Sequence, residues 1–247
     1  MIRLLPGMLA SVLSMACALA DPPGKRIITG ITPGWHDGRD DGFAVDIMRD
    51  FHAYASAPFG FGAMPLRRTI ALYLDKQTDC LLGGDAQAIA AFKPMDDVYS
   101  LPIRSAGIVI YSLAGKPVIH SYDEARRAHL GLEAGFDFHA LLDRLPRLRQ
   151  EAASAESQVK KMQAGRIDAY VGLFPPSKRY GDQLAFDPHF MLMTWTDTLH
   201  CKPEKDNAAF VQSFNNFVTA YEKSGALRQT YGKHFVPDTW VDPLGTK

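Results

Sequence analysis

The segment Tyr99–Tyr111, YSLPIRSAGIVIY, lies near the middle of the chain and consists of two parts of different character. Its first part, Ser100–Arg104, is polar and contains a proline, which is typical of a connection between elements. Its second part, Ile108–Tyr111, is a run of β-branched and aromatic residues that favours a buried strand. We interpret the segment as a hinge strand that passes from one lobe of the protein to another.

Strand-like and helix-like stretches alternate on both sides of this segment. Predicted strands are Arg26–Thr32, Phe59–Pro65, Asp79–Gly84, Leu130–Glu133 and Ile167–Gly172. The alternation predicts an α/β fold in which each lobe has a mixed or mostly parallel sheet flanked by helices. Phe190–Trp195 is again rich in β-forming residues and predicts a second crossing, back to the first lobe. We therefore expect lobe 1 to comprise residues 21–104 and 196–247, lobe 2 to comprise residues 105–195, and a ligand cleft to lie between them.

Several helix starts carry a side chain that can cap the first turn. Ser121 is followed three residues later by a glutamate, and Ser157 and Asp206 precede further helical patterns. After Asp206, aromatic residues recur at helical spacing and predict a long helix with one buried face: Phe210, Phe214, Phe217 and Tyr221.

The N-terminal residues have the layout of an export signal. Arg3 precedes an apolar run, and Ala18-Leu19-Ala20 provides small residues before a cleavage point, so residues 1–20 are a predicted signal peptide that directs the chain to the periplasm. Lipidation at Cys17 is an alternative, but Met15 is large for that motif. After cleavage two cysteines remain, Cys80 and Cys201, which form either a disulfide or two buried thiols.

Charge and motif content exclude several classes of function. The 27 basic and 27 acidic residues give a formal net charge of zero, which argues against nucleic acid as a partner. The eight histidines show no metal-binding spacing, and no phosphate-binding glycine loop is present. We expect a monomer that holds no metal and no cofactor.

Four local motifs resemble type II periplasmic solute-binding proteins of family 3, the amino-acid-type substrate-binding proteins of ABC transporters. They span nearly the whole mature chain and occur in the family's order: Gly42–Ile47 (GFAVDI), Tyr99–Pro102 (YSLP), Met162–Ala169 (MQAGRIDA) and Leu227–Lys233. The resemblance implies a two-lobed fold with two crossover hinge strands, a small-molecule ligand, and membrane transporter subunits or a membrane sensor as partners.

The chain departs from the family at the positions that hold an α-amino acid. The arginine that clamps the ligand carboxylate is replaced by Lys93, which cannot form the same bidentate pair. The acid that holds the amino group is replaced by Leu173, and Gly135-Phe136 stand where the family has a threonine-rich helix start. An amino acid would leave its charges unpaired, so we expect a ligand other than a standard α-amino acid.

The expected architecture places a set of ligand-binding candidates at the cleft. They are Trp35, His36, Asp85, Gln87, Lys93, Arg104, Gly135, Phe136, Gly172 and Phe174. Trp35 either stacks on a ligand or packs against its own lobe, and Arg104 either reaches the cleft or braces the crossing. Lys93 either pairs with an anion or is solvated, and Gly135 and Phe136 begin a helix whose free N–H groups attract acidic groups.

Two alternatives to a transport role follow from the same resemblance. Some relatives work beside a periplasmic quinoprotein dehydrogenase as accessory proteins, and some dehydratases use this fold. A dehydratase needs an acid or base poised in the cleft, and no spacing in the sequence singles one out. The prediction is therefore a binding protein and not an enzyme.

Overall fold

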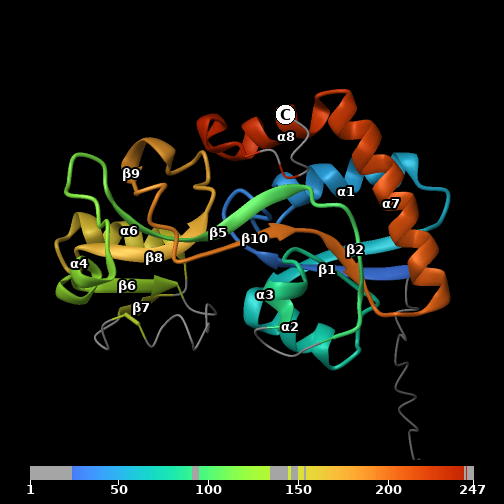
Figure 1. Ribbon diagram of the computed structural model, residues 1–247, viewed down its shortest axis with the longest axis horizontal. Coiled ribbons are helices and arrows are strands. Elements are labelled where there is room, and N and C mark those ends of the chain that lie inside the picture. The colour runs from blue at the N-terminus through green and yellow to red at the C-terminus, as the bar shows by residue number, and fades with distance from the viewer. Residues whose placement is uncertain are drawn as a thin grey trace, which may run out of the picture.

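The computed structural model describes residues 24–90, 95–133, 144–145, 150–152, 154–241 and 243. The predicted signal peptide, Cys17, Lys93, Gly135 and Phe136 lie outside the described residues. Two mixed sheets flanked by helices lie side by side, which confirms the predicted α/β fold (Figure 1). We call the part built on the first sheet lobe 1 and the part built on the second sheet lobe 2; the boundaries expected from the sequence, at residues 104/105 and 195/196, stay a prediction.

The sheet of lobe 1 has five strands in the order β2-β1-β3-β11-β4. Their bounds are Phe59–Pro65, Lys25–Ile31, Cys80–Leu82, Leu199–Cys201 and Val98–Tyr99. β1 is parallel to both β2 and β3, whereas β11 is antiparallel to β3 and β4. The segment that returns from β10 therefore adds a strand, β11, between β3 and β4 of the first sheet.

Helices cover both faces of this sheet. Neighbouring residues of β1 point to opposite faces, so each face presents apolar side chains that a helix can bury. Ile27 packs into a core shared with α1 and α7, and Ile28 packs with Tyr73 of α2 and Ile89 of α3. In Figure 1, α1 and α7 lie on one side of the sheet and α2 and α3 on the other. The bounds of these helices are Phe43–Tyr54, Lys205–Lys223, Leu66–Leu74 and Ala86–Ala90.

The sheet of lobe 2 is ordered β10-β5-β8-β6-β7, with β9 paired to the far end of β5. The bounds of these strands are Met193–Asp197, Arg104–Leu113, Ala169–Phe174, Leu130–Glu133, Gln150–Ala152 and Leu184–Ala185. Ile108 and Ile110 of β5 pack toward α4 (Tyr122–Arg127), and Val109 and Tyr111 pack toward α6 (Ala155–Gln163). The apolar run of the opening segment is thus buried on both faces.

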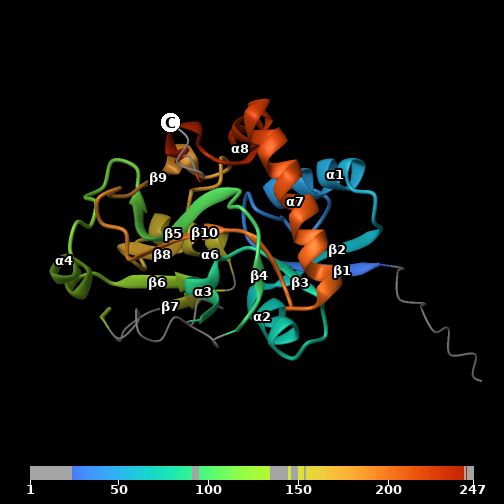
Figure 2. The same cartoon turned by 45° about the vertical axis from the view of Figure 1, so that its right-hand side comes forward.

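Two adjacent segments connect the lobes. The chain leaves β4, enters β5 at Arg104, and returns from β10 directly into β11. The two segments are hydrogen-bonded to each other: Ile103 donates its N–H to the carbonyl of Asp197 at 2.9 Å, and Ser100 donates its N–H to the carbonyl of Leu199 at 2.9 Å. Figure 2 shows these segments between the lobes.

A third link between the lobes comes from the C-terminal region. Helix α8 (Ala226–His234) follows α7, and the residues after it reach the loop that follows β8. There Lys178 donates its N–H to the carbonyl of His234 at 2.8 Å, and Ser177 and Phe235 form an isolated β-bridge. The chain includes two short 3₁₀ helices in this region, Gly181–Gln183 and Pro237–Thr239. No motif in the sequence predicted this third link.

Cys80 and Cys201 form a disulfide across the centre of the first sheet. The two residues are directly paired on the antiparallel strands β3 and β11, with their Cα atoms 4.0 Å apart. The bond closes a loop between positions that are 121 residues apart in sequence. It therefore ties the start of the chain to the segment that returns from lobe 2.

No helix among the described residues is long and apolar enough to cross a membrane. The same part of the chain contains no group of three or more histidine, cysteine or acidic side chains arranged to hold a metal ion.

Candidate functional site

A small cavity lies where the two lobes and the two connecting segments meet. Its volume is about 90 Å³. Lobe 1 contributes residues of β1, α2 and the turn after β3, lobe 2 contributes Leu173 of β8, and the connecting strands contribute Arg104, Trp195 and Asp197. The cavity therefore occupies the position predicted for the cleft, at the carboxyl ends of parallel strands.

Most of the lining is apolar. The described apolar side chains at the cavity are Trp35, Leu66, Ile70, Leu81, Leu82, Ala88, Ile89, Leu173 and Trp195. Leu66 and Ile70 are four residues apart on α2 and so lie on one face of that helix. A cavity of this kind favours a ligand with an apolar body.

Arg104 and Asp197 form a buried ion pair at the cavity. They are register partners where β5 begins and β10 ends, and Nε of Arg104 donates to Oδ2 of Asp197 at 2.6 Å. Each side chain is 5% exposed. The guanidinium lies between two rings, 4.4 Å from the centroid of Trp35 and 4.6 Å from that of Phe235. The two alternatives expected for Arg104 are both realised, because it lines the cavity and also braces the crossing.

Trp35 is fixed by its own lobe. Its Nε1 donates to Oγ1 of Thr29 at 2.6 Å, and that hydroxyl donates to the carbonyl of Leu82 at 2.7 Å. Gly42, with φ of 135°, lets the start of α1 approach the carbonyl of Trp35, where a Cβ atom would lie 2.3 Å from the oxygen. Trp35 is thus a buried core residue, and its ring lies against Arg104 at the wall of the cavity.

The turn after β3 is attached to the return strand by Asp85. One carboxylate oxygen of Asp85 accepts the N–H of Ala88 at 3.0 Å, at the start of α3. The other accepts the N–H of Thr196 at 2.9 Å. Gly84 donates its N–H to Oδ1 of Asp197 at 2.7 Å. Asp85 therefore joins the start of α3 to the return strand β10, and it does not line the cavity.

The other candidates that lie within the described residues are placed around the cavity but do not line it. His36 is buried against Phe61, and burial lowers its pKa below the ordinary histidine value although Asp37 and Asp40 act in the opposite direction. Gln87 is exposed on α3. Gly172 and Phe174 point away from the cavity, because successive strand residues alternate and Leu173 between them lines it. Of the seven candidates within the described residues, the structure brings Trp35 and Arg104 to the cavity.

Sequence reasoning missed Trp195 and Asp197. Nε1 of Trp195 donates a hydrogen bond to Oδ1 of Asp197 at 3.0 Å, which fixes the two side chains to each other at the end of β10. The available signal was the pattern Thr194–Thr198 (TWTDT) in the predicted return crossing. A return strand next to the first crossing must face the same cleft, and an acid there is a natural partner for Arg104.

The fold is found in many solved structures of ligand-binding proteins. The GluR0 ligand-binding core from Nostoc punctiforme, in complex with L-glutamate, is 16% identical with a TM-score of 0.66, and the alignment covers 85% of this chain and 98% of that chain. An arginine transport-system periplasmic binding protein from Legionella pneumophila is 13% identical with a TM-score of 0.59, covering 86% and 100%. The ancestral amino acid-binding protein AncCDT-1, described as a precursor of cyclohexadienyl dehydratase, is 16% identical with a TM-score of 0.64, covering 85% and 95%.

No family model matches the sequence, and the comparison with curated proteins finds no match. The structural likeness defines the class by its fold: the chain has the two-lobed fold of type II periplasmic solute-binding proteins, as the four sequence motifs predicted. At these identities the likeness concerns the fold, and the choice of ligand depends on the residues of this chain.

Proposed function

We propose that this protein binds a small molecule between its lobes in the periplasm and presents it to membrane transporter subunits or a membrane sensor. The observation that carries the proposal is the cavity at the junction of the lobes, because residues of both lobes and of both connecting strands line it. A ligand held there would contact every part that can move when the lobes close. The disulfide is consistent with an oxidising compartment.

We further propose that the ligand is not a standard α-amino acid. Asp197 is the one acid among the described cavity residues, and its oxygens already accept hydrogen bonds from Gly84, Arg104 and Trp195. An α-ammonium group would find no free carboxylate there. Leu173, at the position where the family carries the acid for the amino group, presents an apolar side chain to the cavity.

Binding is favoured over catalysis for the same reason. A dehydratase needs a group that can take up or release a proton at the substrate. Among the described cavity residues the two ionisable groups, Arg104 and Asp197, are paired with each other. His36, the histidine considered from the sequence, lies outside the lining. No observation favours the accessory role beside a quinoprotein dehydrogenase over presentation to a transporter.

A thermal-shift screen of the mature protein tests the proposal. We expect at least one small compound to raise the melting temperature by about 5–10 °C at a concentration near 100 times its Kd, since that binding adds about 2.7 kcal/mol. The twenty standard amino acids should give no shift of this size. A large shift with a standard amino acid would contradict the proposed ligand class.

A cavity-filling variant provides the matched control. Leu173→Trp places a larger side chain in the cavity from the lobe 2 side, so it should abolish the shift while its own melting temperature stays close to that of the wild type. If Leu173→Trp responds to the compound as the wild type does, the ligand binds elsewhere and the proposed site is wrong.

A further inference from the structure

The described lining of the cavity between the lobes carries no net charge. Arg104 and Asp197 are the two charged residues among those described in its lining, and they form a direct ion pair. Their opposite charges cancel within the cavity wall. A charged ligand would therefore add a net charge to a mostly apolar space, which is costly without a compensating partner.

The hydrogen-bonding capacity left on the charged side chains at the cavity is one-sided. Both oxygens of Asp197 accept from donors of the protein, namely Gly84, Trp195 and Nε of Arg104. The two terminal nitrogens of Arg104 have no hydrogen-bond partner within the described part of the chain, although the residue is only 4% exposed. A buried guanidinium has five N–H groups to satisfy, so the described lining offers donors and contains no free carboxylate acceptor.

The size of the cavity limits the ligand further. Pockets for drug-sized ligands have volumes of roughly 300–1,000 Å³, whereas this cavity measures about 90 Å³. It fits a molecule of only a few heavy atoms. Leu66, Ile70 and Leu173 would surround the part of that molecule that carries no polar group.

We propose that the ligand is a small uncharged molecule with an apolar body and a carbonyl or hydroxyl oxygen that accepts hydrogen bonds from the terminal nitrogens of Arg104. This inference rests on the proposed function, because it names the ligand class of the same cavity. A neutral acceptor uses the free donors without disturbing the Arg104–Asp197 pair. A carboxylate would lie next to Asp197 and repel it, and an ammonium group would find no free carboxylate.

Three probes of similar size and different charge test the inference: propionamide, propionate and propylammonium. The titrations use tryptophan fluorescence at neutral pH in a Trp240→Phe background, because Trp35 and Trp195 line the cavity and Trp240 packs against Tyr231. We expect saturable binding of propionamide with a Kd about tenfold or more below those of propionate and propylammonium. Equal or tighter binding of either ion would overturn the inference.

A double variant tests the part assigned to Arg104. Arg104→Met with Asp197→Asn removes both charges at once, so that no buried charge is left without its partner. An unchanged cooperative thermal transition would show that the variant folds. We expect its affinity for propionamide to fall about tenfold or more, whereas Arg39→Met, which removes an exposed arginine, should leave the affinity unchanged. Wild-type affinity in the folded double variant would overturn the assignment.

The outcomes separate this inference from the proposed function. If propionate or propylammonium binds tightly and Leu173→Trp abolishes that binding, the cavity is a ligand site and the assigned ligand class is wrong. Suppose that none of the three probes binds at millimolar concentration while a larger compound from the thermal screen binds in the cavity. The inferred ligand is then too small, and the proposed function stands. If no compound of any class depends on Leu173, both are wrong.

Discussion

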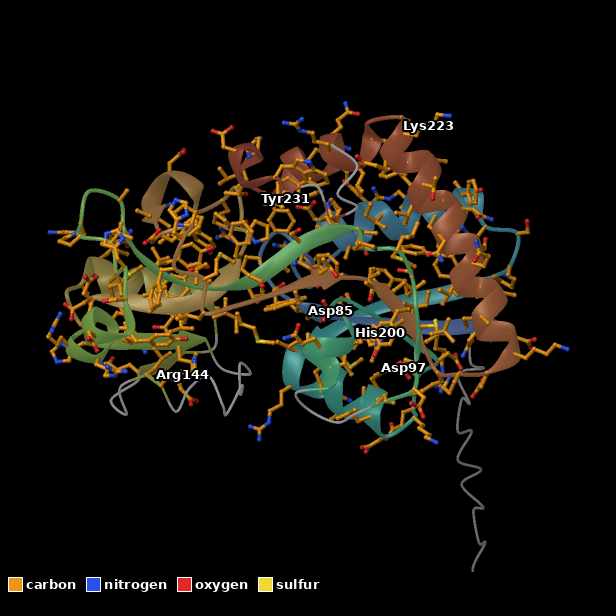
Figure 3. All side chains as sticks on the ribbon, viewed as in Figure 1. Asp85, Asp97, Arg144, His200, Lys223 and Tyr231 are labelled. Carbon is orange, nitrogen blue, oxygen red and sulfur yellow. A yellow bond between two sulfur atoms is a disulfide. The ribbon has the colours of Figure 1, made fainter. Side chains whose placement is uncertain are left out.

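Asp97 and His200 form a buried polar pair in lobe 1, behind the turn that lines the cavity. Nδ1 of His200 lies 3.2 Å from Oδ2 of Asp97, and its Nε2 lies 3.2 Å from the carbonyl oxygen of Gly83. Tyr73 donates its hydroxyl to the same oxygen of Asp97 at 2.5 Å. Figure 3 shows Asp97 and His200 close together in lobe 1. The pair therefore supports the turn at Gly83 from inside the lobe.

The pH dependence of stability should reflect this pair. Burial alone would raise the pKa of Asp97, but hydrogen bonds from His200 and Tyr73 outweigh it and hold the pKa below the ordinary value. A depressed pKa means that the stabilisation is complete above the unfolded-state value of about 3.9 and is lost as the pH falls through the folded-state pKa. Asp97→Asn should lower the free energy of unfolding at pH 7 and flatten its decline below about pH 4, as measured by urea unfolding.

The exposed Asp40 provides a control for that experiment. Asp40→Asn should keep the wild-type decline in stability at acid pH. If Asp97→Asn shows the same acid dependence as the wild type, the carboxylate does not contribute through its native hydrogen bonds.

Single residues show how far the sequence alone could be read. Trp35 and Arg104 could be proposed for the site because Trp35 follows the first predicted strand, Arg26–Thr32, and Arg104 lies in the predicted hinge. The partner of Arg104 was missed although an acid stands in the predicted return crossing, because Asp197 is 93 positions away and only the register of β5 with β10 brings the two together. Gly172, Leu173 and Phe174 could only be placed together at the end of a strand, because the sequence does not tell which face of a strand meets the cleft.

At the scale of elements, the pairing of β3 with β11 determines how lobe 1 is completed. The two strands are joined by backbone pairing and by the Cys80–Cys201 disulfide. In the unfolded chain this bond restricts a loop of more than a hundred residues, which corresponds to about 5 kcal/mol of stabilisation in the chain-entropy description.

Replacement of both cysteines tests the contribution of this bond. Cys80→Ala with Cys201→Ala should lower the free energy of unfolding by about 3–5 kcal/mol, measured by urea unfolding of the oxidised mature protein. The wild type treated with a reductant should lose a similar amount, and the reductant should not affect the variant. A variant as stable as the oxidised wild type would show that the disulfide contributes nothing to stability.

Element positions were predictable where the pattern is local. The bounds of β2 agree with those predicted, and Ser121 caps α4 as expected, accepting the N–H of Glu124. The predicted cap Ser157 was wrong, since α6 begins after Ser154, whose hydroxyl accepts the N–H of Ser157. Asp206 lies in the first turn of α7 and does not cap it. Two potential capping residues stand within one turn of the start of α6, so the sequence does not tell at which of them the helix begins.

At the scale of the whole molecule, the lobes are connected at three places. The two crossings followed from the sequence because each combines a connection with a β-rich run. The link of Phe235 and His234 to the loop after β8 could not be foreseen, because it uses backbone groups and not a recognisable motif. Phe235 also packs on Arg104, so this link reaches the wall of the cavity.

The claim that the ligand binds between the lobes can be tested most directly by ¹⁹F NMR of protein labelled with 5-fluorotryptophan. The chain has three tryptophans, of which Trp35 and Trp195 line the cavity and Trp240 does not. Substitution of each by phenylalanine assigns the three resonances, and the titrant is the compound that gives the largest thermal shift. We expect the resonances of Trp35 and Trp195 to move and that of Trp240 to stay. If both cavity resonances stay in place while the compound binds, the ligand is not held between the lobes.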